Sequence, residues 1–523
     1  MTKPAAKRGT KGATGAGSLP FLIATLSVTI LAAQNADRGI GPLDLPLIFG
    51  FALLVAGTCW VAAGLGTKQS PYRGILAAFL VGVLLFGGRI TDALTATGVD
   101  YRLALGLLLV VSGVAWVILV HRKPPIPVRA VRILAIAAAT LILLNVVAMR
   151  PMFWETPAMS PPEPIISTSI QEQQARPNIY FIVLDAYSGP TSLKEIYGLD
   201  IEDFITSLED MGFVVPRSSR ANYTATFLAL GSMLGMDYLD SLLGPLDPSS
   251  SDRGRVYNLL HDNATTRLLR EKGYRIVFHR SAYPPLNSST TADVHLPAFG
   301  IGEFQVAWVL QTSGPRIYRA VCDLLSCEPD AGLPFSPDGP GALLSKFEAL
   351  GSGEGADTGP VFHYAHFLLP HEPLQFHADC TPREARYWGI DDSEVSPIEV
   401  HSMYVDQVLC ANRLALQTVR DILRREVPAP VIIMQSDHGY ARFPTGRPPA
   451  LDEVSQDQVD ERMDVFAAYH VPGLGTDLTY DGVTPVNAIR AIFSDVFELD
   501  LAPLPDHSYW SSFDRPYDFT RLP

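Results

Sequence analysis

Five apolar segments fill the first 150 residues of this 523-residue chain, and they constrain its fold more than any other feature. They cover residues 19–36, 44–66, 74–92, 103–121 and 131–149. A helix needs roughly 20 apolar residues to cross about 30 Å of hydrocarbon, so each segment is long enough, or nearly so, to span a membrane. Because four spans follow the first segment, we interpret it as a signal anchor rather than a cleaved signal peptide.

Positive charges beside these segments predict how the chain crosses the membrane. They precede the first segment and lie between segments two and three and between segments four and five: Lys3, Lys7, Arg8, Lys11, Lys68, Arg73, Arg122, Lys123, Arg129 and Arg132. The other two loops carry acids beside their few arginines. The positive-inside rule then places the N-terminus in the cytoplasm and everything after Arg150 outside, in the periplasm or the extracellular space.

The charge balance changes at the same point. Residues 1–150 hold 14 Lys and Arg and 4 Asp and Glu, whereas the remainder holds 26 basic and 50 acidic residues, a net charge of −24. Such an acidic half excludes a nucleic-acid surface. We expect a basic cytoplasmic tail (1–18), a five-helix transmembrane domain (19–149), a Pro-rich linker (150–176) and a soluble domain (177–523). No ionisable residue lies in mid-span, which favours an anchor over a transporter.

The soluble domain alternates short apolar runs with amphipathic segments. Strands are predicted to begin near Asn178, Arg275, Val361, Val431 and Val465, and helices cover about 201–211, 227–236, 263–271, 398–426 and 486–497. This alternation predicts an α/β fold with a doubly wound, mostly parallel sheet. Residues 281–360, rich in Pro, Gly and Ser, indicate only an irregular insertion.

Polar residues stand where three of these strands end. They are Asp185 after the first strand, His366 and His371 at the third, and Asp437 with His438 at the fourth. The carboxyl ends of parallel strands lie along one edge of a sheet, so these side chains can converge. Two carboxylates, an imidazole and a hydroxyl suit a divalent cation of intermediate hardness.

The hydroxyl of such a site is predicted to come from a threonine at a helix start. Thr226 opens a predicted helix shortly after Asn222 and Tyr223. A bound cation lowers the pKa of a hydroxyl, and the positive end of a helix stabilises an alkoxide and an attacked phosphate. Thr226 is therefore a candidate nucleophile, with Thr224 of the same loop as the alternative. Taken singly it is an ordinary helix cap, but four polar clusters at four element ends favour a site.

These residues resemble the sulfatase-like branch of the alkaline phosphatase superfamily. The motifs that carry the resemblance lie in residues 177–187, 222–226, 366–373 and 435–439. Five spans ahead of such a domain are similar to lipoteichoic acid synthases and lipid A phosphoethanolamine transferases. The resemblance implies site roles for five residues: Asp185, Asp437 and His438 as metal ligands, Thr226 as ligand and nucleophile, and His371 in contact with the transferred group.

The resemblance also implies a reaction. It is the transfer of a phosphoglycerol- or phosphoethanolamine-type headgroup from a membrane lipid to a glycan or lipid acceptor, at the outer face of the cytoplasmic membrane. The implied cofactor is a divalent metal, zinc or manganese ahead of magnesium or calcium. The sulfatase motif Cys/Ser-x-Pro-Ser-Arg is absent, since Thr226-Phe227-Leu228-Ala229 stands in its place. A second metal site is not evident; His366 and His470 are the candidates for one.

Two other functions remain open from the sequence. The first is a phosphodiester or sulfate-ester hydrolase, in which water takes the second step with the same nucleophile. The second is a membrane-anchored envelope scaffold without catalysis, which predicts no bound metal. The cysteines add a structural expectation: with Cys59 in a span and four outside, disulfides Cys322–Cys327 and Cys380–Cys410 are predicted, with free thiols as the alternative.

Overall fold

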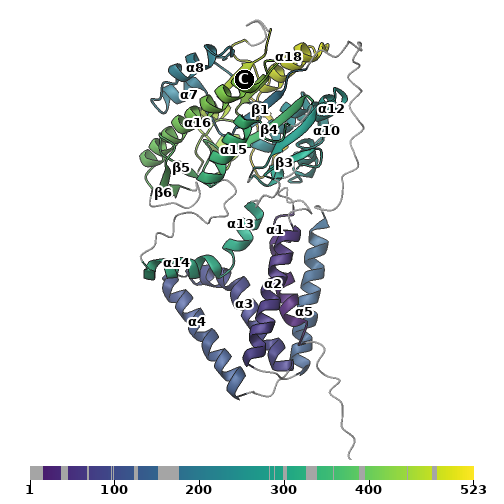
Figure 1. The fold of residues 1–523 in the computed structure, drawn as a ribbon, viewed down its shortest axis with the longest axis vertical. Coiled ribbons are helices and arrows are strands. Elements are labelled where there is room, and N and C mark those ends of the chain that lie inside the picture. Colours follow the sequence, from purple (N-terminus) through teal and green to yellow (C-terminus); the bar gives the residue numbers. More distant parts are fainter. Residues whose placement is uncertain are drawn as a thin grey trace, which may run out of the picture. The chain divides into compact units, whose positions relative to one another are not determined.

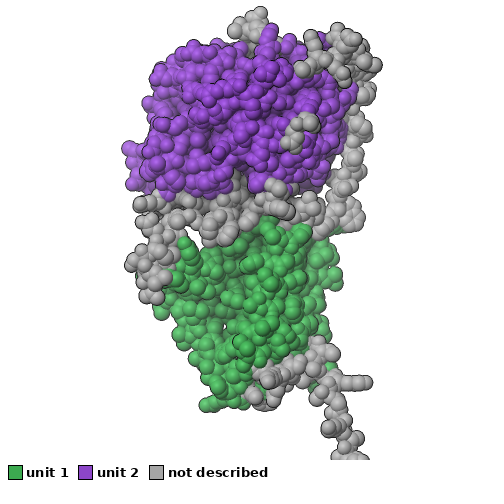
Figure 2. Space-filling model, in the orientation of Figure 1, with its two compact units in different colours: residues 1–155, 303–331 green, residues 156–302, 332–523 purple. Residues whose placement is uncertain are grey.

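The computed structural model describes most of the chain and divides it into two compact units (Figure 2). The membrane unit comprises residues 1–155 and 303–331, and the soluble unit comprises residues 156–302 and 332–523. The described residues are 16–36, 45–66, 70–95, 97, 99–122, 128–150, 176–281, 283–287, 289–297, 303–325, 339–356, 359–387, 395–443, 446–473 and 480–523.

The predicted apolar segments of the membrane unit are all helices. They are α1 (Leu19–Gln34), α2 (Leu45–Gly66), α3 (Ser70–Thr95), α4 (Tyr101–Val117, continued by a π-helical turn, Ile118–Arg122) and α5 (Val128–Ala148). By length and composition four of them, α2 to α5, are able to cross a membrane, and α1 is a shorter apolar helix. Alanines such as Ala24, Ala52 and Ala63 are fully buried, which allows close helix packing, while Leu54 and Leu103 are about two-thirds exposed.

The prediction of an irregular insertion at 281–360 is wrong. The insertion contains β3 (Val294–Leu296) and three helices, α13 (Glu303–Leu310), α14 (Gly314–Leu325) and α15 (Pro340–Ser352). Pro340 lies in the first turn of α15, where the missing N–H of proline breaks no helical hydrogen bond, so its presence does not exclude a helix. Helices α13 and α14 belong to the membrane unit, and α15 to the soluble unit.

The soluble unit is built on a six-stranded sheet with the order β3-β2-β4-β1-β7-β8. Its other strands are β1 (Ile179–Leu184), β2 (Arg275–His279), β4 (Val361–Phe367), β7 (Val431–Gln435) and β8 (Ala467–His470). Strands β1, β3 and β4 of this sheet are labelled in Figure 1. All neighbours are parallel except β8, which runs antiparallel to β7. The predicted mostly parallel α/β fold is therefore confirmed.

Helices cover both faces of this sheet. Alternate residues of β1 point to opposite faces: Phe181 packs in one apolar core with residues of α9 and α18, and Ile182 in a second core with residues of α8, α15 and α16. The remaining elements of the unit are α7 (Pro190–Glu195), α8 (Glu202–Glu209), α9 (Thr226–Gly235), α10 (Leu239–Leu243), α11 (Gly254–Leu259), α12 (Ala264–Glu271), α16 (Pro397–Arg425), α17 (Gln456–Met463), α18 (Pro485–Phe497), the hairpin β5 (Leu374–Phe376) with β6 (Pro382–Tyr387), the pair β9 (Tyr509–Trp510) with β10 (Thr520–Arg521), and the 3-10 turns Pro284–Leu286 and Leu451–Glu453.

One predicted disulfide is present. Cys380, between β5 and β6, is bonded to Cys410 in α16. Cys59 in α2 is a buried free thiol. Cys327 lies outside the described residues, so its pairing with Cys322 stays a prediction.

Candidate active site

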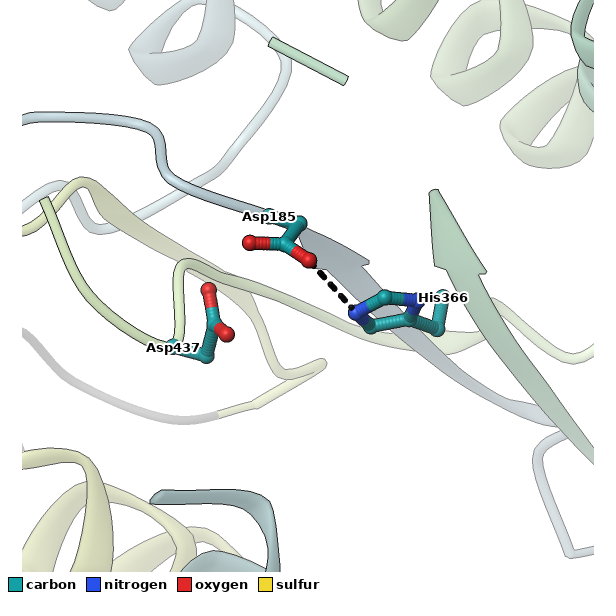
Figure 3. Close-up of side chains that lie close together, drawn as sticks. All are labelled: Asp185, His366 and Asp437. Atoms are coloured by element: carbon teal, nitrogen blue, oxygen red, sulfur yellow. Dashed lines mark ion pairs between the residues drawn. The ribbon is translucent and has the colours of Figure 1, made fainter. Parts of the chain in front are cut away.

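Three parallel strands deliver the predicted polar residues to one edge of the sheet (Figure 3). Strand β1 lies between β4 and β7, and Val183 of β1 pairs with His366 on one side and Gln435 on the other. Asp185 follows β1 directly, and Asp437 follows β7 after one intervening residue. Candidate metal-binding atoms of Asp185, His366 and Asp437 all lie within 4.8 Å of one another.

His438 and Thr226 reach the same place. His438 Nε2 lies 3.3 Å from Asp437 Oδ2 and 3.7 Å from Asp185 Oδ1. Thr226 Oγ1 lies 3.2 Å from the same imidazole nitrogen. The structure therefore brings together all four predicted metal ligands, with His366 beside them. Each of these side chains is buried: Thr226 is 8% exposed and the other four at most 1%.

Several polar atoms in this cluster have no hydrogen-bond partner among the described residues. They are Asp185 Oδ1, Asp437 Oδ2 and His366 Nε2. His366 Nε2 lies 3.3 Å from Asp185 Oδ2 without hydrogen-bond geometry (dashed in Figure 3). A buried polar atom without a partner costs about 1–3 kcal/mol, and more when it is charged. Three such atoms in one buried cluster therefore fit a bound cation, which would supply the missing partner.

The two carboxyl groups are electrostatically coupled. Burial and the charge of Asp185 raise the pKa of Asp437 to about 6. Burial also opposes ionisation of Asp185, but the positive charge of His371 and the neighbouring imidazole of His366 outweigh it and hold the pKa of Asp185 below its ordinary value. Two acids so close cannot both ionise cheaply without a positive partner, so a bound cation would favour the ionised form of both.

Neighbouring groups orient the imidazoles. Ser281 Oγ lies 3.0 Å from His366 Nδ1, so the other nitrogen of that ring faces Asp185. His438 Nδ1 lies 3.1 Å from Gly439 O, which directs its Nε2 to the carboxylates and Thr226. Burial, with the charge of Arg462, lowers the pKa of His438 well below its ordinary value. The ring is therefore neutral, the form that binds a metal.

Thr226 is not a helix cap in this structure. The N-cap of α9 is Ala225, and Thr226 is the first helical residue, with its hydroxyl directed at His438. The hydroxyl of Thr224 instead donates to Ser511 O at 2.9 Å and is fully buried. Of the two threonines of this loop, Thr226 is thus the one at the cluster. Asn222 holds this loop in place, because its side-chain amide donates a hydrogen bond to His507 O and accepts one from Val486 N.

His371 lies at the outer side of the cluster. Its side chain is 35% exposed, and its ring centroid is 6.5 Å from that of His438. Its backbone N–H donates to Asp185 O, which ties the loop after β4 to the end of β1. Burial lowers the pKa of His371, but the carboxylates of Asp185 and Glu372 outweigh it and raise the pKa above its ordinary value.

His470, named from the sequence as a candidate for a second metal site, does not lie at the cluster. His470 pairs with Ile432 near the start of β7, and its Nδ1 contacts Pro430 O at 2.8 Å. It therefore lies at the opposite edge of the sheet from Asp437. The antiparallel direction of β8 explains this, because the carboxyl end of an antiparallel strand points away from the carboxyl ends of its parallel neighbours.

Arg462, which the sequence did not suggest, connects the two halves of the cluster. It is 7% exposed, and its guanidinium donates to Thr224 O at 2.7 and 2.9 Å and to Gly439 O and Tyr440 O at 3.1 Å. It thus joins the threonine loop to the turn that carries His438. A lone arginine in a polar helix gives no sequence signal for this role.

Gly439 is needed because another chain segment lies close to it. A Cβ at this position would lie 1.9 Å from Glu461 O at the end of α17. The Asp-His-Gly sequence thus brings α17, and with it Arg462, against the end of β7. His366 was easier to find from sequence, since it is the penultimate residue of β4 in a run that otherwise reads as a buried strand.

The structure was compared with known proteins. It is similar to the periplasmic domain of EptC from Escherichia coli in complex with Zn (12% identity, TM-score 0.39, 63% of this chain and 84% of that one). It is also similar to the integral membrane phosphoethanolamine transferase EptA from Neisseria meningitidis (12%, 0.38, 92% and 95%). A third similar structure is an alkaline phosphatase superfamily protein from Vibrio parahaemolyticus (13%, 0.37, 67% and 76%).

These solved structures belong to the groups that the sequence motifs resemble. No family model and no curated protein matches the sequence. The reaction of this chain is therefore argued from its own side chains.

Proposed function

We propose that this chain is a metal-dependent phosphotransferase of the cytoplasmic membrane, with its soluble unit outside. It would move a phosphoglycerol- or phosphoethanolamine-type headgroup from a lipid to a glycan or lipid acceptor. The observation that carries the proposal is the buried convergence of Asp185, Asp437, His438 and Thr226, with unpartnered acidic and imidazole atoms in the same cluster. The orientation rests on the positive-inside rule.

The residues present fit one divalent cation. Asp185, Asp437, His438 and the hydroxyl of Thr226 form a mixed oxygen and nitrogen donor set, which suits zinc or manganese better than the all-oxygen preference of magnesium or calcium. His366 is a fifth donor within reach of both carboxylates. When bound, the cation supplies positive charge that favours the ionised hydroxyl and offsets charge on phosphoryl oxygens.

Thr226 acts as the nucleophile in this proposal. Its position at the first residue of α9 places the hydroxyl where the helix dipole favours negative charge and where backbone N–H groups are free for phosphoryl oxygens. Its oxygen forms a bond to phosphorus, the ester bond to the lipid alcohol breaks, and the alcohol leaves with a proton. The acceptor hydroxyl then takes the headgroup from Thr226 and the threonine hydroxyl is restored.

In this proposal, His371 contacts the transferred group. It is the most exposed of the residues described at the cluster, so an incoming headgroup meets it before the buried ligands. Its main-chain bond to Asp185 fixes its distance from the carboxylates. The membrane helices would hold the soluble unit near both donor and acceptor, which lie at the bilayer.

The decisive experiment replaces the nucleophile. Thr226→Ala should lose at least about 10³-fold in turnover of a phosphodiester lipid, and Thr226→Ser should keep a measurable part of it. Thr418→Ala in α16 is the matched control, because Thr418 is also buried but lies outside the cluster. Mass spectrometry of the wild type with donor alone should find the headgroup on Thr226. Equal rates for Thr226→Ala and the wild type would refute the proposal.

Labelled donor supplied with and without acceptor separates transfer from hydrolysis. Release of label that depends on the acceptor supports the transferase, and release without it identifies a hydrolase that uses the same residues. Elemental analysis of protein purified without chelator tests the scaffold alternative. One bound divalent ion per chain excludes the metal-free scaffold, whereas none removes the basis of the catalytic proposal.

A further inference from the structure

The hairpin of α13 and α14 (residues 303–325) interrupts the soluble unit but packs with the membrane helices. Residues up to 302 and from 332 onward belong to the soluble unit. Phe304 and Trp308 of α13 are 5% and 3% exposed within the core formed by α1, α2 and α3. The Trp308 ring meets Phe51 of α2 edge to face at 5.9 Å. The chain therefore returns to the membrane unit after leaving it at α5.

The turn of this hairpin hydrogen-bonds to the backbone of α3. Ser313 N donates to Leu84 O at 2.8 Å, and Arg89 N donates to Gln311 O at 3.3 Å. Ser313 Oγ also donates to Val83 O at 2.6 Å. Irregular backbone is tolerated at membrane depth only where protein satisfies its polar groups, and these bonds meet that requirement.

Two glycines of α3 make room for the turn. A Cβ at Gly87 would lie 1.9 Å from Ser313 Oγ, and a Cβ at Gly88 would lie 2.5 Å from Gln311 O. Neither distance is possible for a real Cβ, so a larger residue would displace the hairpin. Gly82, on the same helix, has no atom within 4 Å of its Cβ position. The glycine pair is thus specific to the place where the hairpin binds.

Charged residues mark the level of the aqueous interface on these helices. Arg316 of α14 forms an ion pair with both carboxylate oxygens of Asp92 at 2.6 Å, and Arg89 Nε donates to Gln311 Oε1 at 2.6 Å. About 12 Å of helix rise separates Leu84 from Asp92. With Asp92 at the interface, the Ser313 turn lies in the hydrocarbon of the outer leaflet.

Apolar side chains of the hairpin remain exposed. Leu310, Tyr318 and Val321 are 43–44% exposed, and the spacing of Tyr318 and Val321 places them on one face of α14. The neighbouring helix α4 also presents Leu103 and Leu107, which are 66% and 53% exposed. The exposed apolar surface of α14 therefore continues that of a membrane span.

We propose that the α13–α14 hairpin is a second membrane attachment of the soluble unit, inserted in the outer leaflet with Leu310, Tyr318 and Val321 against lipid acyl chains. The occupant of this surface is lipid, because the surface continues the span surface and its turn is hydrogen-bonded as a lipid environment demands. This attachment does not depend on the reaction that the soluble unit catalyses.

Photo-cross-linking in native membranes tests the proposal directly. A benzophenone amino acid at position 318 or 321 should give phospholipid adducts by mass spectrometry, at about tenfold or more the yield of the same group at Val427, which is 92% exposed on the soluble unit. Absence of lipid adducts at both positions, or cross-links to a second copy or another protein instead, would overturn it.

A matched pair of glycine variants tests how the hairpin is held. In proteoliposomes, Gly88→Leu should raise tryptic cleavage after Arg316 about tenfold, because the turn leaves α3, while Gly82→Leu should leave cleavage unchanged. Unchanged cleavage in folded Gly88→Leu would contradict the binding of the turn to α3. If that variant does not fold, the cross-linking yields decide the question alone.

Discussion

Arg462 offers the sharpest test of how the site is assembled. The change is Arg462→Met, which keeps the length of the side chain and removes all four of its hydrogen bonds to Thr224 O, Gly439 O and Tyr440 O. Burial lowers the pKa of Arg462 to about 10 although nearby acids oppose this, so the group is charged at neutral pH. The variant leaves Thr224 O and Tyr440 O without this donor, while Gly439 O keeps its contact with His438 Nδ1.

The expected magnitude follows from the lost donor of those two acceptors and from the loss of the buried guanidinium. An unsatisfied buried acceptor costs about 1–3 kcal/mol, and breaking a buried charged network costs about 3–5 kcal/mol. We therefore expect Arg462→Met to lower the free energy of unfolding by about 3–5 kcal/mol and Tm by about 10 °C. Arg462→Lys keeps the charge but has one nitrogen, so its loss should be intermediate. Arg217→Met is the control, because its ion pairs with Glu202 and Glu209 are exposed.

Activity separates a positioning role from a purely structural one. The guanidinium holds the Thr226 loop against the His438 turn, so metal affinity and kcat, measured well below the Tm of the variant, should each fall about 10–100-fold. Thermal unfolding, metal titration and turnover of a phosphodiester lipid measure the three effects. A folded Arg462→Met protein with wild-type Tm, metal affinity and kcat would refute the reasoning.

Three further outcomes are expected in the soluble unit. Burial lowers the pKa of His363 to about 3, so this ring stays neutral in the folded protein, whereas in the unfolded chain it takes up a proton below about pH 6.5. The contribution of His363 to stability is therefore complete above that pH and is lost as the pH falls. Between pH 7 and pH 5.5 the free energy of unfolding should fall by about 1 kcal/mol more in the wild type than in His363→Phe. Reduction of the Cys380–Cys410 disulfide, whose cysteines are 30 residues apart in sequence, should lower the free energy of unfolding by about 3–4 kcal/mol. Thermal unfolding with and without reductant measures this loss, and Cys380→Ala is the control that should not respond to reductant. Removing divalent cations from a protein saturated at about 100 times Kd should lower the free energy of unfolding by about 2.7 kcal/mol. In Asp437→Asn, chelator should change the unfolding temperature little. Equal changes in the variant and the wild type would contradict the metal assignment.

The elements of the chain were largely predictable from local pattern. Membrane helices follow from the length of apolar runs, and β1, β2 and β4 were predicted because fully buried strands read as continuous apolar stretches. The boundaries of α16 and α18 agree closely with prediction, since Ser396 and Thr484 stand at N-cap positions and each is followed by a proline in the first turn. The short helices of the 281–360 insertion were missed because their apolar runs are too short to distinguish from loop.

The sequence by itself also determined which residue types stand at the strand ends, and hence that a cation-binding cluster was available. Only the tertiary structure decided that these ends meet. The order of β4, β1 and β7 brings His366, Asp185 and Asp437 together, and the start of α9 places Thr226 beside His438, 212 positions away in the chain. It also decided that Arg462 joins the two loops, that His470 lies at the opposite edge, and that α13 and α14 pack with the membrane helices. The local sequence pattern indicates which secondary structure a segment prefers. These contacts instead depend on strand order, on strand direction and on the space left by glycines, and no single segment encodes those features.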